Sequence, residues 1–107
     1  MTQFPQRGEV WLAELDKVRP VVVLARYPMG KFLNSVIIVP VTSTIRGLST
    51  EVLVGPEDDI RTPSAANLDT IQLLARTRLV RHVGRVRPIT LNSLCAALFI
   101  AIDCYGL

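Results

Sequence analysis

The stretch from Arg19 to Leu24, with the sequence RPVVVL, constrains the fold more than any other part of this chain. Its three consecutive valines pack well on a pleated sheet and lose side-chain freedom in a helix, so this stretch predicts a β-strand. Pro20 stands near its start, where a strand loses little by lacking an N–H donor. The rest of the chain is therefore interpreted around a strand at this position.

Other short apolar runs, separated by Pro, Gly and polar residues, predict further strands. These strands are expected at residues 8–15, 35–41, 50–54, 64–74 and 82–86, with a brief turn at 76–80. Pro40 suggests a bulge or an edge position near the end of the 35–41 strand. Only three residues separate Leu15 from Arg19, so a tight turn is expected between the first two strands.

The C-terminal stretch predicts an α-helix that starts at a capping Thr90 and stops before Gly106. Its apolar residues recur at helical spacing on one face: Leu91, Leu94, Cys95, Leu98, Ala101, Ile102 and Tyr105. Ala96, Phe99 and Ile100 lie off that face, so a second buried face is expected. The fold class is thus mainly β, with an antiparallel or mixed barrel of five to six short strands and a C-terminal helix packed against it.

Length and composition indicate one soluble domain over residues 1–107. Half of the residues are apolar, which is enough for a single core. The longest apolar run, Leu94 to Ile102, falls well short of the roughly 20 residues of a membrane-spanning helix. No signal-peptide pattern is visible at the start, so a cytoplasmic location is expected. Cys95 and Cys104 are too far apart along one helix to form a disulfide, and we interpret them as small apolar side chains.

Charge is unevenly distributed, although the net charge is only +3. No acidic residue occurs between Asp69 and Asp103, and this stretch contains five arginines and one histidine: Arg76, Arg78, Arg81, His82, Arg85 and Arg87. The arginines form either a solvated face or a surface for a polyanion, and the sequence favours neither. His82, within a predicted strand, is interpreted as a surface or hydrogen-bonded structural residue rather than a general base.

Several kinds of site have no candidate residues in this sequence. The adjacent acids Glu57, Asp58 and Asp59 are interpreted as a solvated loop, because neighbouring carboxylates repel unless a cation holds them. There is no cluster of His and Cys at metal-ligand spacing, no phosphate-binding glycine loop and no serine nucleophile motif. We therefore expect neither a metal nor another cofactor.

Five short motifs in order point to a known family. They are RGEVW at 7–11, RPVVVL at 19–24, VPVTSTIRG at 39–47, SAANLD at 64–69 and VGRV at 83–86. In this order, ahead of an apolar helix, the chain resembles the MazF/PemK (Kid) toxins of type II toxin–antitoxin systems. The resemblance implies an SH3-like barrel, a homodimer, neutralisation by a cognate MazE-like antitoxin, and metal-independent cleavage of single-stranded RNA that leaves 2′,3′-cyclic phosphate and 5′-hydroxyl ends.

The resemblance also places the catalytic residues. The family's arginine falls on Arg19 and its threonine on Thr42. A guanidinium offers a fixed fork of donors to charge that develops on phosphate oxygens, and a hydroxyl adds a further hydrogen bond. Around these two, RNA contacts are expected from Asp16, Lys17, Pro20, Ser43, Thr44, Arg46 and Asn67.

The short first loop puts in doubt any carry-over of a family glutamate's role, and two other functions stay open. Many relatives carry a longer, glutamate-containing loop between the first two strands, whereas this chain has only Asp16, Lys17 and Val18 there. The same barrel also serves CcdB-type gyrase poisons, and Tyr105-Gly106-Leu107 resembles their C-terminus. A barrel that binds RNA or a partner without catalysis, through the arginines of residues 76–87, is the third alternative.

Overall fold

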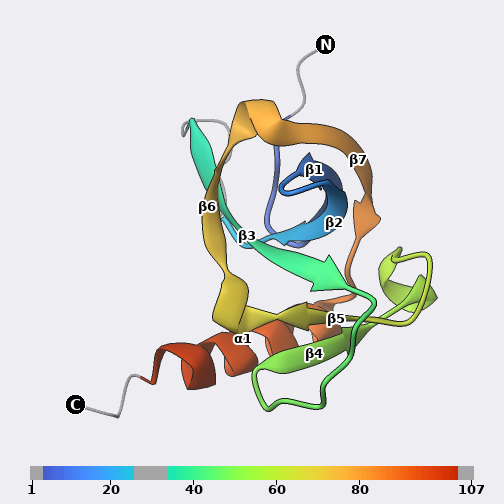
Figure 1. The fold of residues 1–107 in the computed structure, drawn as a ribbon, viewed down its shortest axis with the longest axis vertical. Helices are drawn as coiled ribbons and strands as arrows, with labels where there is room; N and C mark the ends of the chain where they lie inside the picture. The colour runs from blue at the N-terminus through green and yellow to red at the C-terminus, as the bar shows by residue number, and fades with distance from the viewer. Residues whose placement is uncertain (1–3, 26–33, 104–107) are drawn as a thin grey trace.

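The computed structural model describes residues 4–25 and 34–103. Within them an antiparallel seven-stranded sheet curls around itself, and one helix packs along its lower side (Figure 1). The strands are β1 Glu9–Glu14, β2 Val18–Val23, β3 Ser35–Thr42, β4 Glu51–Val54, β5 Ser64–Asn67, β6 Gln72–Ala75 and β7 Leu79–Arg85. The helix is α1 Pro88–Ile102, and three short 3₁₀ turns are η2 Pro56–Asp58, η3 Leu68–Thr70 and η4 Arg76–Arg78.

This architecture confirms the predicted fold class, with one more strand than the upper limit of six that the sequence suggested. The sheet order is β4-β5-β3-β2-β1-β7, and β6 also pairs with β3. The extra strand arises because the single strand expected at 64–74 is divided into β5 and β6 by the turn η3. The last strand also begins at Leu79, earlier than the predicted 82–86.

Strand β3 has different neighbours at its two ends. Its first half, Ser35–Ile38, pairs with β6, whereas Val41 and Thr42 pair with β5. Pro40 lies between these pairings and is in register with Val21 of β2 only. A residue without an N–H is tolerated there because one side of the strand offers no ladder. Pro40 therefore lies in an interior strand, at a point where one side of that strand is a local edge, in line with the edge position that the sequence suggested.

Two apolar cores form on opposite faces of the central strands. Side chains on a strand alternate between faces, so neighbouring residues enter different cores. Val10, Val22 and Val39 face the helix-side core, which also contains Leu94 and Ala97 of α1. The other core, here called the strand core, is formed by Trp11, Ala13, Val21, Val23, Ala25, Val36, Ile38 and Leu74. Burial on both faces explains why RPVVVL is apolar without alternation.

The helix begins and packs differently from the expectation. Arg87 is its N-cap residue and Pro88 follows at the first helical position, which suits the fixed φ of proline. Thr90 is therefore not the cap. The buried residues of α1 are Thr90, Leu94 and Ala97, while Cys95 and Ile102 of the predicted stripe are exposed.

The helix also leaves apolar side chains accessible to solvent. Ala96, Phe99 and Ile100 are exposed in this chain. The apolar interpretation of Cys95 as a packed side chain is wrong, since its sulfur accepts a hydrogen bond from Arg7 at 2.9 Å. Cys104, Tyr105, Gly106 and Leu107 lie outside the described residues.

A buried carboxylate connects η2 to the start of α1. Asp58 is fully buried, so the interpretation of Glu57, Asp58 and Asp59 as a solvated loop is wrong for this residue. Its Oδ1 accepts hydrogen bonds from the Arg87 backbone N–H at 2.9 Å and the Thr90 hydroxyl at 2.7 Å. Burial raises the pKa of Asp58, but the hydrogen bonds from Arg87 and Thr90 outweigh it and lower the pKa below the ordinary value.

His82 and Gly84 of β7 have structural roles. The His82 ring lies 5.3 Å from the Trp11 ring, and its Nε2 is 2.9 Å from the Gly84 carbonyl oxygen and 3.3 Å from Glu9. This confirms the structural interpretation of His82. A side chain at Gly84 would collide with Asp59, which explains the glycine of the VGRV motif. No helix among the described residues is long and apolar enough to cross a membrane.

Candidate functional site

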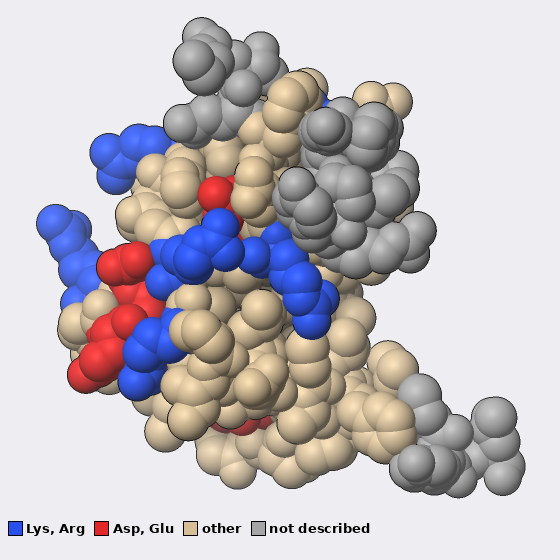
Figure 2. All heavy atoms as spheres, turned by 180° about the vertical axis from the view of Figure 1, so that it is seen from behind, with Lys and Arg blue, Asp and Glu red and all other residues tan. Residues whose placement is uncertain are grey.

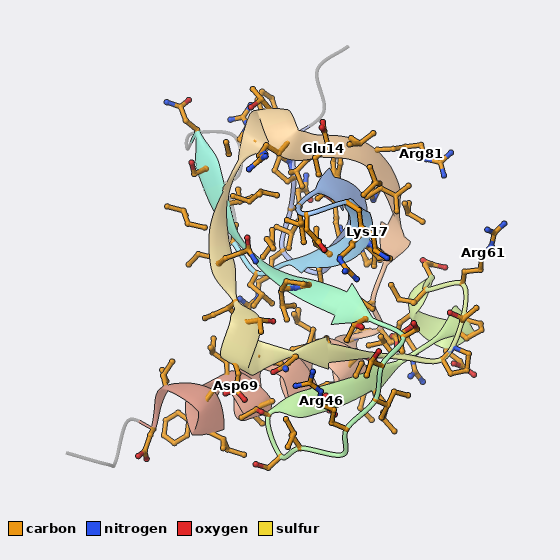
Figure 3. All side chains as sticks on the ribbon, in the orientation of Figure 1. Glu14, Lys17, Arg46, Arg61, Asp69 and Arg81 are labelled. Carbon is orange, nitrogen blue, oxygen red and sulfur yellow. The ribbon has the colours of Figure 1, made fainter. Side chains whose placement is uncertain are left out.

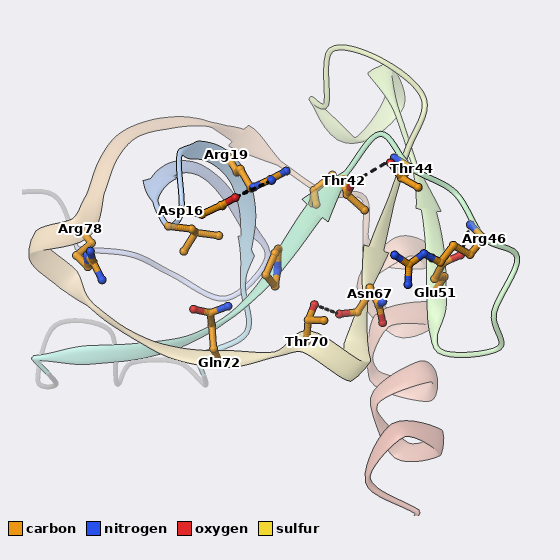
Figure 4. A pocket seen from close by; sticks show the side chains of 13 residues that line it. Asp16, Arg19, Thr42, Thr44, Arg46, Glu51, Asn67, Thr70, Gln72 and Arg78 are labelled. Atoms are coloured by element: carbon orange, nitrogen blue, oxygen red, sulfur yellow. Dashed lines mark hydrogen bonds and ion pairs between the residues drawn. The ribbon is translucent and has the colours of Figure 1, made fainter.

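An open pocket with a volume of about 540 Å³ lies where strands β2, β3, β5 and β6 meet the loops that follow β1 and β3 (Figure 4). Leu15, which packs against the strand core, forms part of its wall. The residues that line it are Leu15, Asp16, Arg19, Pro40, Val41, Thr42, Thr44, Arg46, Glu51, Asn67, Thr70, Gln72 and Arg78. The pocket is thus polar around its mouth and apolar at part of its wall.

Arg19 enters the pocket from β2 and is held by Asp16 of the tight turn. The turn is closed by a hydrogen bond from the Leu15 N–H to the Lys17 carbonyl at 3.0 Å. Asp16 accepts two hydrogen bonds from Arg19, from Nε at 2.8 Å and from Nη2 at 3.0 Å. This pair lowers the pKa of Asp16 well below its usual range and raises the pKa of Arg19. Both side chains therefore stay charged.

The geometry of this pair leaves donors of Arg19 available. A guanidinium has five N–H donors, and Asp16 occupies one on Nε and one on Nη2. The two N–H groups of Nη1 and the second of Nη2 remain at the tip of the side chain. In Figure 4 this tip extends from β2 across the mouth of the pocket toward Thr42. The free N–H groups of Arg19 thus form a second fork of donors, which faces an acceptor bound between Arg19 and Thr42.

Thr42 ends β3 on the other side of the mouth. Its Oγ1 accepts a hydrogen bond from the Thr44 N–H at 3.1 Å. A hydroxyl that accepts in this way still has its own hydrogen to donate. Thr42 therefore offers one donor to the space that the Arg19 tip also reaches.

The loop after β3 is organised by Glu51 of β4. Its Oε1 accepts hydrogen bonds from three consecutive backbone N–H groups, those of Arg46 at 3.1 Å, Gly47 at 2.8 Å and Leu48 at 3.3 Å. Gly47 has φ of 75°, a left-handed conformation in which glycine is not strained. These contacts fix the backbone that carries Arg46 into the pocket, so Glu51 is a positioning residue that sequence reasoning missed.

Six of the nine residues predicted for the site line this pocket: Asp16, Arg19, Thr42, Thr44, Arg46 and Asn67. The other three do not. Lys17 and Ser43 are exposed beside it, and Pro20 lines a separate hollow with Leu12 and Arg81. Strand alternation explains Pro20, because consecutive residues of β2 project to opposite faces and Arg19 takes the pocket side.

The pocket also contains residues that the motifs did not indicate. Thr70 and Gln72 come from the chain around η3 and β6, and Arg78 comes from η4. They were missed because a single strand was expected at 64–74, whereas the turn η3 interrupts it and directs the chain toward the pocket. The signal that was available for Arg78 is its position in the acid-free arginine stretch.

That arginine stretch is not one surface. Arg87 forms an ion pair with the buried Asp58 at 3.2 Å, and Arg85 lies 3.8 Å from Glu9. Arg81 lines the hollow that contains Pro20, whereas Arg78 lines the main pocket. Figure 2 shows a band of arginine and lysine side chains on the opposite side from Figure 1, with acidic side chains at one end of the band. Within residues 4–25 and 34–103, no group of three or more His, Cys, Asp or Glu side chains is placed to hold a metal ion.

Comparison with known proteins places this chain in a family. Residues 6–102 match the model of a family described as PemK-like, MazF-like toxin of type II toxin–antitoxin system. A Mycobacterium tuberculosis protein named probable endoribonuclease MazF5 is 42% identical over 107 residues, which cover 97% of this chain and 98% of the relative. A second relative from that organism, probable endoribonuclease MazF2, is 35% identical and covers 92% of this chain and 99% of its own length.

Solved structures show the same fold. The Mycobacterium tuberculosis toxin MazF-mt6 superposes with a TM-score of 0.85 and 34% identity, covering 89% of this chain and 96% of that protein. A mycobacterial endoribonuclease in complex with its cognate antitoxin gives a TM-score of 0.86 at 29% identity, covering 94% of this chain and 96% of the other.

Proposed function

Because this chain belongs to the PemK-like, MazF-like toxin family of type II toxin–antitoxin systems, we propose that it is a metal-independent endoribonuclease. It cleaves single-stranded RNA, whether mRNA, tRNA or rRNA, at short sequences and thereby stops translation and growth. The ribose 2′ hydroxyl attacks the adjacent phosphorus, and the products carry a 2′,3′-cyclic phosphate and a 5′ hydroxyl. With this substrate the protein acts in the cytoplasm.

The observation that carries this proposal is that Arg19 and Thr42 line the same pocket from its two sides. Negative charge grows on the non-bridging phosphate oxygens as the 2′ oxygen attacks. The free N–H groups of Arg19 and the Thr42 hydroxyl are donors fixed before the substrate arrives, and such preorganised donors stabilise developing charge most effectively. Arg19 and Thr42 therefore act on the transition state of the cleavage step.

The ion pair with Asp16 bears on what Arg19 does. Asp16 raises the pKa of Arg19, so loss of a proton from the guanidinium becomes still less favourable. The pair thus favours charge stabilisation over a general-base role for Arg19, because a base has to lose its own proton before it accepts another. It also orients the guanidinium before the substrate arrives, so part of the entropy of orienting it is lost on folding and not on substrate binding.

We also infer that a cognate MazE-like antitoxin inhibits the enzyme by covering this pocket. A basic site that binds phosphate also attracts an acidic, disordered peptide tail. A structural relative is a mycobacterial endoribonuclease in complex with its antitoxin. The test is cleavage of RNA by the purified toxin–antitoxin complex. Unimpaired cleavage, with Arg19 still accessible, would contradict this mode of inhibition.

The activity itself is tested by incubating the purified chain with a long single-stranded RNA in EDTA and analysing the ends. We expect discrete cleavage sites, 3′ fragments that polynucleotide kinase phosphorylates directly, and 5′ fragments that end in a cyclic phosphate. Gyrase-dependent DNA breaks without RNA cleavage would instead support a CcdB-like poison. Retarded RNA without cleavage would support a non-catalytic binding barrel.

A further inference from the structure

The pocket extends in two directions from Arg19 and Thr42. On one side it is lined by Thr44, Arg46 and Asn67. On the other side lie Gln72 of β6 and Arg78 of η4, at the opposite end of the pocket from Arg46 (Figure 4). We call this second end the Gln72–Arg78 arm. All six pocket residues predicted from the motifs lie outside it.

The strand core supports the Gln72–Arg78 arm from below. Gln72 and Leu74 project from the same face of β6, because side chains two residues apart on a strand share a face. Leu74 is buried in the strand core, whereas Gln72 is exposed and lines the pocket. Leu79, directly after Arg78, also packs against that core. The two polar side chains therefore extend from a backbone that is anchored on both sides.

Among the described residues, none neutralises the charge of Arg78. No ion pair or hydrogen bond joins its guanidinium to any other described residue, and the same holds for the guanidinium of Arg46. The two acids of the pocket have other partners, since Asp16 binds Arg19 and Glu51 accepts three backbone N–H groups. Arg78 and Arg46 are thus exposed cations at the two ends of one pocket.

The chemistry of this arm suits a nucleotide. A free guanidinium binds the oxygens of a phosphodiester in a bidentate fashion, and a glutamine amide both donates to and accepts from the edge of an unpaired base. An RNA strand cleaved internally also has to continue on both sides of the cleaved phosphate. One arm alone would leave one of these two flanking segments without contacts.

We propose that Gln72 and Arg78 form a second RNA-binding subsite, which holds the nucleotide on the side of the cleaved phosphate opposite to Arg46. Arg78 binds its backbone phosphate and Gln72 contacts its base. The subsite rests on the proposed function, because it presupposes that the phosphate cleaved lies between Arg19 and Thr42. It makes Gln72 a determinant of sequence preference and Arg78 a determinant of affinity.

The test uses a short RNA around a mapped cleavage site, with a 2′-deoxy nucleotide at that site so that binding is measured without cleavage. We expect Arg78→Gln to weaken binding about tenfold and to reduce the slope of log affinity against log salt by about 0.7, the value for one phosphate contact with a single strand. Arg61→Gln is the matched control, because Arg61 is exposed and lies away from the pocket (Figure 3). Its affinity should stay within about twofold of wild type, as for a distant surface charge.

Shortened RNAs locate the contact. When the nucleotides on one side of the cleavage site are removed, Arg78→Gln should bind as well as wild type while Arg46→Gln still weakens binding. Removal of the other side should reverse this pattern. The proposal is overturned if Arg78→Gln keeps wild-type affinity and salt slope, or if its loss is the same for both shortened RNAs. If wild-type protein neither binds nor cleaves RNA, the proposed function fails as well.

A separate readout checks Gln72. The full set of cleavage sites in a long RNA should change for Gln72→Ala, while the rate at the preferred site falls only about threefold, the effect of one neutral hydrogen bond. An unchanged set of sites would overturn the role of Gln72. Thermal unfolding by circular dichroism confirms that each variant is folded.

Discussion

At the scale of single residues, the pair of Asp16 and Arg19 sets the properties of the site. Asp16 is largely exposed, so its hydrogen bonds to Arg19 orient the guanidinium without burying a charge. We expect Asp16→Asn to lower the single-turnover cleavage rate by at most about fivefold, since exposed ion pairs contribute little. Glu14→Gln, at the end of β1 outside the pocket, is the control and should leave the rate unchanged. A loss of a thousandfold for Asp16→Asn would show that its carboxylate takes part in proton transfer.

Comparison of variants at Thr42 and at its neighbour Ser43 tests whether the Thr42 hydroxyl has a specific role in catalysis. Thr42→Ala removes one neutral donor from the pocket and should reduce the single-turnover rate about tenfold, less than the loss of a charged donor. Thr42→Ser keeps the hydroxyl and should retain most of the rate. Ser43→Ala should have no effect, because Ser43 does not line the pocket. Equal effects of Thr42→Ala and Ser43→Ala would contradict the assignment.

At the scale of secondary-structure elements, Asp58 joins η2 to the N-terminus of α1. Asp58→Ala leaves the Arg87 N–H and the buried Thr90 hydroxyl without their acceptor, so we expect a loss of about 2–4 kcal/mol in the free energy of unfolding. Urea denaturation measures it. Glu57→Ala changes the exposed acid next to it and should alter stability by no more than about 0.5 kcal/mol. Similar values for the two variants would contradict the role of Asp58.

The lowered pKa of Asp58 makes the stability of the fold depend on pH, with a loss of stability toward acidic pH. The native state lowers the pKa below that of the unfolded chain, about 3.9 for Asp. The carboxylate therefore stabilises the fold fully above that value, and the contribution is lost as the pH falls through the lower, native pKa. Wild type should lose stability in this acidic range more steeply than Asp58→Ala. Parallel pH profiles would contradict the prediction.

The elements also show how far sequence reasoning reaches. The spacing and type of apolar residues predicted β1 to β4 and the helix, because β-branched runs favour strands and apolar residues at helical spacing favour a helix. They missed the division of residues 64–74 by η3, which combines local hydrogen bonds from the Asp69 N–H and the Thr70 hydroxyl to Asn67 with a bond from Thr50, 19 residues away, to Asp69. For the same reason Gln72 and Arg78 were not assigned to the pocket, while Arg19 and Thr42 were indicated by motifs. Asp58 was misjudged because its partners lie 29 and 32 residues away.

At the scale of the whole molecule, the helix leaves an apolar surface exposed. Phe99 and Ile100 are 45% and 52% exposed, and α1 itself contains no charged residue. Patches of this kind mark interfaces, so we expect a homodimer that buries this surface. Ile100→Glu should shift the protein toward monomer in equilibrium sedimentation. Val80→Glu, an exposed apolar position on β7, is the control and should not. A wild-type monomer at micromolar concentration that cleaves RNA would contradict the prediction.

The central claim concerns the whole site: Arg19 stabilises charge in a metal-independent cleavage of RNA. Its most direct test is the single-turnover cleavage rate of Arg19→Ala in EDTA on a short RNA, with circular dichroism to confirm the fold. We predict a loss of about a hundredfold to a thousandfold, as for other preorganised donors. Arg19→Lys should recover little of it, because a point charge does not reproduce the planar fork. A rate for Arg19→Ala close to wild type would contradict the account and move the chemistry away from this pocket.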